Sequence, residues 1–382
     1  MNTKNMKKAI ALATCCTTLF SIAACGGGEG GGGKSGMIST KPLTVAELGE
    51  GFNAKYLPDA SSIRQFSGKI DVCLDFEGTQ DGWRALAKEY ERLQDGGVKV
   101  NINTNFAHYT VTMDALRAGK HVFCEKPITV NYALSLEMKE EADKQGKMLN
   151  IGVCNRYHKS VEMLEEMVRN GEFGNLYHVY CSFRDFRSIP GLGGAFTTKE
   201  QSGGGVLIDW GVHFLDLILY ILGGAKLKNL TCDAYCEMAK DMKAYKYNDM
   251  WAEDTADIEN GTNDVDDFIT GYIRTDKASI SFNGAWAQNI NKPEMFIDFL
   301  GDKCGARLKY GSRFELYRAD TLETVTYDYE IPNMYLREDS AFIESIETGV
   351  KDRNNIDNIL ESAKLLDSLY ASAAQRKEIE LN

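Results

Sequence analysis

The sequence predicts an α/β chain in two parts, a parallel sheet with crossover helices followed by a region of antiparallel strands and helices. Two patterns favour this fold class. Between residues 69 and 154, apolar runs suited to buried strands alternate with helical stripes, whereas between residues 267 and 317 apolar and polar residues alternate with period 2. The length of 382 residues also exceeds what one hydrophobic core usually serves, so we expect two domains.

The composition is that of a globular protein. Apolar residues make up 43% and charged residues 26% of the chain, and the formal net charge is -12 at pH 7. This negative charge repels phosphate backbones, so nucleic acid is not an expected partner.

Residues 1–25 have the pattern of a lipoprotein signal peptide. Three lysines precede an apolar stretch, residues 9–24, that is too short to span a bilayer comfortably. The stretch ends in the sequence IAAC, which resembles a bacterial lipobox and makes Cys25 the expected lipid anchor. We therefore expect a membrane-anchored extracytoplasmic lipoprotein, with a short interfacial helix or an uncleaved anchor as the alternative.

The cysteines beyond this segment indicate a different compartment. Seven of them are scattered singly along the chain, at Cys73, Cys124, Cys154, Cys181, Cys232, Cys236 and Cys304. Scattered spacing is typical of free thiols in a reducing compartment, so the later part of the chain looks cytoplasmic. Cys232 and Cys236 lack a second cysteine pair or a nearby histidine to complete four zinc ligands, so we interpret both as structural.

Residues 26–68 are expected to form a flexible tether, because they open with a glycine tract at residues 26–36. The tract matches the phosphate-loop pattern GxxxxGKS at residues 28–35 and the dinucleotide pattern GxGxxG at residues 28–33. Both patterns bind phosphate only between a buried strand and a helix N-terminus. The flanking sequence predicts neither, so we attribute the matches to composition.

The first predicted elements form a βαβ unit. An apolar strand at residues 69–76 is followed by a helical stripe at residues 83–93 and a strand at residues 98–103. With the lipobox and the tether, residues 1–102 resemble the start of an extracytoplasmic solute-binding lipoprotein of an ABC transporter.

From residue 103 the motifs change. The loop NTNFAH leads into a predicted helix at residues 109–118, then into GKHVFCEKP at residues 119–127, a helix at residues 132–144 and a strand at residues 148–154. Together with GGGVLIDWGVH at residues 203–213, these motifs strongly resemble the Gfo/Idh/MocA family of sugar and inositol oxidoreductases, and the resemblance extends over residues 103–382.

The resemblance implies an incomplete Rossmann-like parallel sheet over residues 69–150. A substrate and oligomerisation domain over residues 151–382 follows, built on a large open, mostly antiparallel sheet. Its alternating patterns predict strands at 267–274, 278–286, 295–300 and 307–317, and helices at 340–347 and 356–375. A sheet with helices on one face leaves the other face for a partner subunit, so we expect a homo-oligomer.

The candidate catalytic residues are Lys126, Asp209 and His213. Oxidation of a secondary alcohol needs a base within hydrogen-bond reach and a cation to steady negative charge on oxygen, and His213 and Lys126 suit these roles. If the segment to Leu222 is helical, Asp209, His213 and Asp216 share one face, and a neighbouring carboxylate would orient the imidazole and raise its proton affinity. In the resembled family the matching aspartate and histidine form the proton relay, and the lysine contacts the substrate hydroxyl and the nicotinamide region.

Other interpretations of these residues stay open. His213 could be a buried core histidine, and Asp209, His213 and Asp216 could bind a metal. Three ligands on one helical face rarely close a coordination shell, so no metal is expected. Arg184 and its neighbours Asp185 and Arg187 could grip hydroxyl groups, although a surface ion pair is the simpler explanation.

The resemblance implies NAD or NADP as the cofactor. The residues it places near the cofactor are Asn105, His108, Glu125, Lys126 and Arg156, the last of which could equally be an exposed structural arginine. One departure from the family pattern is clear. The family's opening strand carries GxGxxG and its second strand ends in a residue that reads the ribose, whereas residues 37–100 supply neither.

The predicted function is NAD(P)-dependent hydride transfer at a sugar or cyclitol hydroxyl. His213 would act as the base, Asp209 would orient it, and Lys126 would be the electrostatic anchor. Because the glycine turn is missing, we expect the cofactor half to be impaired and the chain to be a fusion. The alternatives are a carbohydrate-binding lipoprotein without catalysis and an inactive fusion product.

Overall fold

The fold is described from a computed structural model, over residues 68–73, 98–103, 107–129, 131–247, 250–310, 313–329 and 333–381. The predicted signal peptide, the predicted tether up to residue 67, and the predicted helix at residues 83–93 lie outside these ranges. Asn105 lies outside them too.

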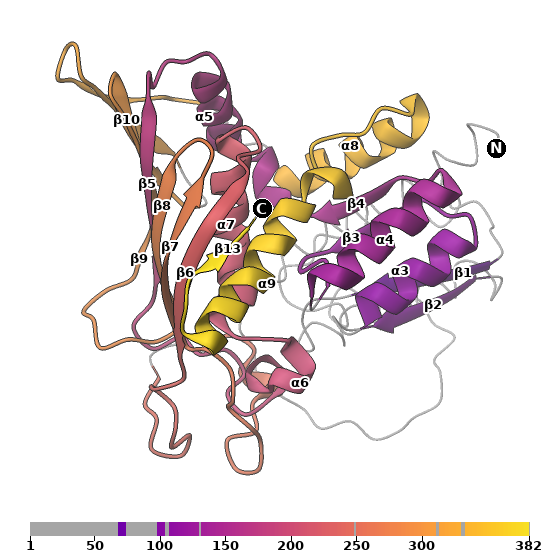
Figure 1. The fold of residues 1–382 in the computed structure, drawn as a ribbon. Helices are drawn as coiled ribbons and strands as arrows, with labels where there is room; N and C mark the ends of the chain where they lie inside the picture. Colours follow the sequence, from indigo (N-terminus) through magenta and orange to yellow (C-terminus); the bar gives the residue numbers. More distant parts are fainter. Residues whose placement is uncertain are drawn as a thin grey trace.

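The first part of the fold consists of two parallel strand pairs with helices beside them (Figure 1). Strands β1 (Gly68–Cys73) and β2 (Val98–Asn103) pair in parallel, as do β3 (Val122–Glu125) and β4 (Leu149–Gly152). The helix α4 (Tyr132–Gln145) is the crossover that a parallel β3–β4 pair requires. Within the described residues the two pairs form separate sheets, and no ladder joins β2 to β3.

Local sequence explains where α4 begins and ends. The Asn131 side chain accepts a hydrogen bond from the Leu134 N–H at 3.0 Å, which caps the first turn. Gly146 ends the helix in the left-handed conformation, with φ of 60°. The preceding helix α3 (Ala107–Arg117) packs beside α4.

The core of this first part is completed by the C-terminal region of the chain. Met138 of α4 and Leu149 of β4 are buried in one apolar cluster with Ile356, Ile359 and Ala363. The Ile151 N–H also donates to the Asn354 carbonyl at 2.9 Å. The β3–β4 region and the C-terminal region therefore share one core.

A nine-stranded sheet forms the second part. Its spatial order is β12-β11-β10-β9-β5-β8-β7-β6-β13, and every neighbouring pair is antiparallel except β5 with β8. The bounds of the strands are β5 (Leu176–Arg184), β6 (Leu227–Tyr235), β7 (Phe268–Thr275), β8 (Ser279–Ala285), β9 (Glu294–Gly301), β10 (Cys304–Lys309), β11 (Phe314–Arg318), β12 (Thr324–Thr326) and β13 (Ile379–Glu380). The predicted order, a parallel region followed by a large, mostly antiparallel sheet, is confirmed.

Helices cover one face of this sheet, between the sheet and the parallel region (Figure 1). They are α5 (Lys159–Arg169), α7 (Val212–Ile221) and α9 (Leu360–Gln375). The main core lies in this layer, where Phe183 of β5 stacks on Phe214 of α7 with ring centroids 4.9 Å apart. The segment 199–221, which includes α6 (Lys199–Ser202), is apolar enough to cross a membrane, but 78% of its most apolar window is buried, as expected for a core helix.

Several predicted bounds differ from the structure. The predicted strand at 307–317 is two antiparallel strands, β10 and β11. Helix α8 (Met334–Thr348) begins well before residue 340 because the Asn333 side chain accepts hydrogen bonds from two N–H groups of its first turn. The predicted helix at 356–375 is a 3₁₀ turn (Ile356–Asn358) followed by α9.

Candidate active site

Three distant segments bring a lysine, an aspartate and a tryptophan together. Lys126 directly follows β3, and its side chain is almost fully buried, with the residue 7% exposed. Its Nζ lies 3.7 Å from Oδ1 of Asp209, which belongs to the π-helical turn Leu207–Gly211. The Trp286 indole N–H donates to the other carboxylate oxygen, Oδ2, at 3.1 Å. Asp209 thus bridges the end of the parallel region to the end of β8.

His213 lies in the first turn of α7, and Asn155 holds its ring. The Asn155 amide nitrogen is 3.4 Å from Nδ1 of His213 and donates to the Tyr310 hydroxyl at 2.8 Å. Tyr310 in turn stacks on Phe214, with ring centroids 4.3 Å apart. The imidazole therefore sits in a packed setting fixed by groups from three elements.

The pKa of His213 is lowered well below its usual 6.5. Burial of the ring is the larger cause, and the positive charge of Lys126 is the second. The expected rise in proton affinity through Asp209 is therefore wrong. At neutral pH the imidazole is neutral and can accept a proton, while the Lys126 ammonium can stabilise an oxygen that develops negative charge.

Asp216 does not join this group. Its carboxylate forms a bidentate pair with Arg156, at 2.8 Å to Nε and 2.6 Å to a terminal nitrogen. Ser362 of α9 donates to the same carboxylate at 2.6 Å. The prediction that Asp209, His213 and Asp216 act together on one helical face is therefore wrong for Asp216, which forms a separate buried ion pair with Arg156.

Arg156 is consequently not an exposed arginine, and its contact with a cofactor stays a prediction. It is 2% exposed, and its guanidinium also donates to the backbone carbonyls of Arg353 at 2.7 Å and Asn358 at 3.1 Å. These contacts tie the 3₁₀ turn Cys154–Tyr157 to α7 and the C-terminal segment. Arg156 thus links three segments of the chain through hydrogen bonds.

His108 and Glu125 lie around the Lys126 loop. His108 is buried, and its Nδ1 is 2.7 Å from the carbonyl oxygen of Pro127. The Glu125 carboxylate accepts a hydrogen bond from the Lys126 N–H at 3.2 Å. It also lies against Gly152, where a Cβ would come within 2.7 Å of Glu125 Oε2. Contact of either residue with a cofactor stays a prediction.

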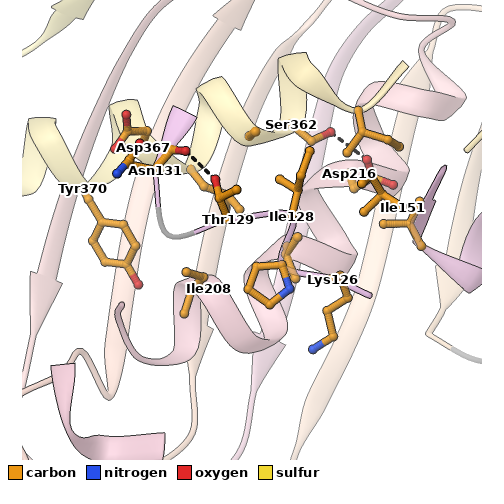
Figure 2. A pocket seen from close by; sticks show the side chains of 16 residues that line it. Lys126, Ile128, Thr129, Asn131, Ile151, Ile208, Asp216, Ser362, Asp367 and Tyr370 are labelled. Carbon is orange, nitrogen blue, oxygen red and sulfur yellow. Dashed lines mark hydrogen bonds between the residues drawn. The ribbon is translucent and has the colours of Figure 1, made fainter. Parts of the chain in front are cut away.

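A small, partly open cavity lies behind the Lys126 loop, between that loop and α9 (Figure 2). Ile128, Thr129, Asp216 and Tyr370 are among the residues that line it. Its volume of about 30 Å³ has room for a water or two but not for a sugar ring.

The structure fits the nicotinamide end of a dinucleotide. Ligands of doubly wound sheets bind at the carboxyl ends of the parallel strands, and Lys126 follows the carboxyl end of β3. A buried ammonium group and a neutral imidazole at that edge suit a site where an alcohol and a nicotinamide meet. The pyrophosphate end would depend on residues outside the described ranges.

Sequence reasoning missed Trp286, Asn155 and Tyr310. Trp286 follows a strand and Tyr310 follows another, and nothing in their local pattern marks them as neighbours of Asp209 or His213. Asn155 is next to Arg156 in the same 3₁₀ turn, but an uncharged amide gives no signal of its own in the sequence. Only the fold brings these three residues to the site.

Comparison with known proteins supports this architecture. Residues 96–153 match a family model described as the oxidoreductase family, NAD-binding Rossmann fold. Residues 161–307 match the GFO/IDH/MocA C-terminal domain, and the two matches together span more than half of the chain.

Three proteins of similar sequence are named as dehydrogenases or oxidoreductases. The D-glucoside 3-dehydrogenase of Escherichia coli is 29% identical over 278 residues, which are 72% of this chain and 77% of that protein. A putative UDP-kanosamine synthase oxidoreductase subunit of Amycolatopsis mediterranei is 32% identical over 48% of this chain and 50% of its own length. The myo-inositol 2-dehydrogenase of Thermotoga maritima is 29% identical over 37% of this chain and 41% of its own length. The chain thus spans half or less of the latter two.

Solved structures share the fold at lower identity. An aldose-aldose oxidoreductase from Caulobacter crescentus, complexed with glycerol, superposes with a TM-score of 0.65 at 18% identity, covering 83% of this chain and all of that one. An inositol dehydrogenase homologue from Azotobacter vinelandii, complexed with NAD+, gives 0.60 at 16% identity, covering 78% and 82%. At these identities the likeness establishes the fold alone.

Proposed function

Because the chain belongs to the Gfo/Idh/MocA oxidoreductase family, we propose that it catalyses NAD(P)-dependent hydride transfer at a ring hydroxyl of a sugar or cyclitol. The observation that carries the proposal is the meeting of Lys126, Asp209 and His213 at the carboxyl edge of β3. The names of the relatives, which include a glucoside and an inositol dehydrogenase, support the substrate class.

Each residue of the site has a distinct role in the proposed reaction. The nicotinamide, when bound, supplies the hydride acceptor or donor. Lys126 donates a hydrogen bond to the substrate oxygen and steadies its negative charge. His213 takes the hydroxyl proton as a neutral base. Asp209 anchors the Lys126 ammonium, and Trp286 holds Asp209 in place.

Asn155 decides which nitrogen of His213 serves as the base. With the amide nitrogen toward Nδ1, as the structure has it, the hydrogen of the neutral ring lies on Nε2. A rotation of the amide by ~180° puts its oxygen there, moves the ring hydrogen to Nδ1 and leaves Nε2 free to accept a proton. The Tyr310 hydroxyl can donate or accept and so tolerates both orientations. We assign catalysis to the rotated form.

The His213 ring should titrate well below pH 6.5. Burial and the Lys126 charge both disfavour the imidazolium, so the ring stays neutral as the pH falls through 6.5 and protonates only at lower pH. NMR titration of the five histidines, with the His213 signal assigned by its loss in His213→Gln, measures this. Lys126→Met should raise the His213 pKa, and a pKa at or above 6.5 in the unchanged protein would contradict the described setting.

We further propose that the nucleotide half binds cofactor weakly, since residues 37–100 lack the glycine turn that lets backbone N–H groups approach a pyrophosphate. The test is a fluorescence titration with NADH of the full chain beside a chimera. In the chimera, residues 1–102 are replaced by a nucleotide-binding half-domain that carries GxGxxG. We expect the chimera to bind NADH and oxidise methyl glucoside or myo-inositol. Tight NADH binding by the unaltered chain would contradict the proposed impairment.

Trp286→Phe in this chimera tests the support of Asp209. The substitution keeps an aromatic ring but removes the N–H that donates to the carboxylate. A hydrogen bond to a charged group contributes ~1.5–3 kcal/mol, so we expect kcat to fall by about 10- to 100-fold. The matched control is Trp251→Phe, because Trp251 packs edge-on against Phe196. Equal kcat values for the two variants would contradict the proposed role of Trp286 in supporting Asp209.

We also infer that the chain forms homo-oligomers through the face of the large sheet that carries no helices. Aromatic pairs lie on this face, namely His178 with Tyr272 and Tyr180 with Phe296, with centroids 6.3 and 5.7 Å apart. An aromatic surface without covering helices is typical of subunit contacts. Light scattering coupled to size exclusion measures the assembly, and a monomer at micromolar concentration would contradict it.

A further inference from the structure

A buried carboxylate holds the segment that leads into Asp209. Asp266 lies just before β7 and is 7% exposed. Its Oδ1 accepts the Gly205 N–H at 2.8 Å, and its Oδ2 accepts the Leu207 N–H at 2.9 Å. Its backbone carbonyl accepts the Val206 N–H at 2.8 Å. One residue of a distant segment thus satisfies three successive N–H groups that the start of a helix leaves without a helical partner.

Tyr370 adds a fourth contact to Asp266. It projects from α9 into the small cavity behind the Lys126 loop (Figure 2). Its hydroxyl donates to Asp266 Oδ1 at 2.9 Å. The carboxylate therefore receives two N–H groups and one O–H group, a set that suits an ionised carboxylate because such a group only accepts.

The triple-glycine segment, residues 203–205, makes room for these two side chains. A Cβ on Gly204 would overlap the Tyr370 hydroxyl, and a Cβ on Gly205 would overlap the Asp266 carbonyl oxygen. Gly203 has φ of 82°, in the left-handed region that favours glycine. The glycines of the sequence motif thus allow Asp266 and Tyr370 to close on the chain ahead of Asp209.

A chain of hydrogen bonds continues from this segment to Asp209. Gly205 donates its N–H to Asp266, and its carbonyl accepts the Asp209 N–H at 3.1 Å. The Asp209 carboxylate then lies 3.7 Å from Nζ of Lys126. A shift of Gly205 would therefore move the backbone that carries Asp209.

The residue next to Asp266 holds the other support of Asp209. The Asp267 backbone carbonyl accepts the Trp286 backbone N–H at 3.0 Å. The Trp286 indole N–H in turn donates to Asp209 Oδ2 at 3.1 Å. Residues 266 and 267 thus fix both the backbone of Asp209 and the side chain that orients its carboxylate.

We propose that Asp266 and Tyr370 are positioning residues of the reaction, an inference that rests on the proposed hydride transfer. They hold the triple-glycine segment so that the Asp209 carboxylate stays against Lys126 and Trp286. Both act through Asp209. A misplacement of about 1 Å caused far from the reacting atoms can lower a rate by ~10²-fold. A loosened segment should therefore lower kcat more than it raises KM.

The first test needs no turnover and uses the full chain without cofactor. The ¹⁵N NMR signal of the Trp286 indole N–H, assigned by its loss in Trp286→Phe, reports the contact with Asp209. Tyr370→Phe keeps the ring and removes the hydroxyl. Asp266→Asn places an amide nitrogen against one of the backbone N–H groups. Each variant should shift the signal and raise its hydrogen-exchange rate by about tenfold or more.

Tyr317→Phe is the matched control for this test. It also removes a tyrosine hydroxyl that donates to a carboxylate, because the Tyr317 hydroxyl donates to Glu315 at 2.8 Å. Both residues belong to β11 of the large sheet. The control should therefore leave the position and the exchange rate of the Trp286 signal unchanged.

The second test measures turnover in the NADH-binding chimera. Tyr370→Phe should lower kcat by about tenfold and change KM by less than about twofold. The double variant Asp266→Asn with Tyr370→Phe should lose no more than Asp266→Asn alone, because the hydroxyl acts through the carboxylate. A role in stability alone would lower the melting temperature and leave the kcat of the folded protein unchanged.

The outcomes separate positioning from the proposed function. An unchanged Trp286 signal in folded Tyr370→Phe would overturn the proposal, even if Asp266→Asn does not fold. Losses of kcat that multiply in the double variant would overturn it as well, as would a lower melting temperature with kcat unchanged. A chimera that binds NADH but has no turnover would contradict hydride transfer, and the NMR comparison would still decide whether Asp266 and Tyr370 hold Asp209.

Discussion

Replacing His213 with alanine in the NADH-binding chimera is expected to lower kcat by about 10²–10⁴-fold, the usual contribution of a positioned base. The neutral imidazole is the described group with the right protonation state to take a hydroxyl proton at neutral pH, and Asn155 fixes its ring. Alanine removes the base while the surrounding helix stays apolar. Stopped-flow measurement of NADH formation gives the rate of the hydride step directly.

The matched control is His178→Ala. This histidine is also partly buried, and burial also lowers its pKa, but it bonds Ser279 and Ser281 on the large sheet. Its replacement should leave the hydride step within about twofold, because no proton relay passes through it. Lys126→Met should cost about 10²–10³-fold through lost charge stabilisation. Undiminished turnover in both His213→Ala and Lys126→Met would contradict the assignment of the site.

Asp216→Ala should lower the free energy of unfolding by about 3–5 kcal/mol, because it leaves the buried Arg156 charge without its carboxylate. The loss follows from desolvation. The guanidinium keeps its two backbone carbonyl partners but loses the bidentate pair that balances its charge. Urea denaturation followed by tryptophan fluorescence measures the change in the midpoint and the slope.

Two comparisons make this result specific. Asp298→Ala breaks the bidentate pair with Arg307, which is much more exposed, and should cost no more than about 1 kcal/mol. The double variant Arg156→Met with Asp216→Leu removes both charges together and should be considerably more stable than Asp216→Ala alone. A loss under about 1 kcal/mol in Asp216→Ala would contradict the structural role of this pair.

The sequence predicted that Lys126, Asp209 and His213 belong to one site, and the structure brings Lys126 and Asp209 together as an ion pair. It did not predict the partner of Asp216. A carboxylate three residues from His213 fits the same helical face, and only the packing of the Cys154–Tyr157 turn against α7 presents Arg156 to it instead. Side-chain pairing across such distances has no local signature.

The fold was predicted best where particular residues mark the ends of an element. Helix α4 matched within a residue, because Asn131 and Gly146 mark its ends. Strand β5 was missed although its sequence LYHVYCSFR alternates, with apolar Val179, Cys181 and Phe183 on the core face and polar His178, Ser182 and Arg184 on the other. The chain reverses direction between β10 and β11, and an alternating pattern alone does not show where such a turn falls.

The core that residues 113–153 share with the C-terminal segment has a consequence for biosynthesis. Ile356, Ile359 and Ala363 fill the centre of the parallel region, and Asn354 bonds β4. A ribosome making ~5–20 residues per second delivers these side chains only tens of seconds after β4 has emerged. Until then the apolar groups of residues 113–153 stay uncovered, so the nascent chain exposes the kind of surface that holding chaperones bind.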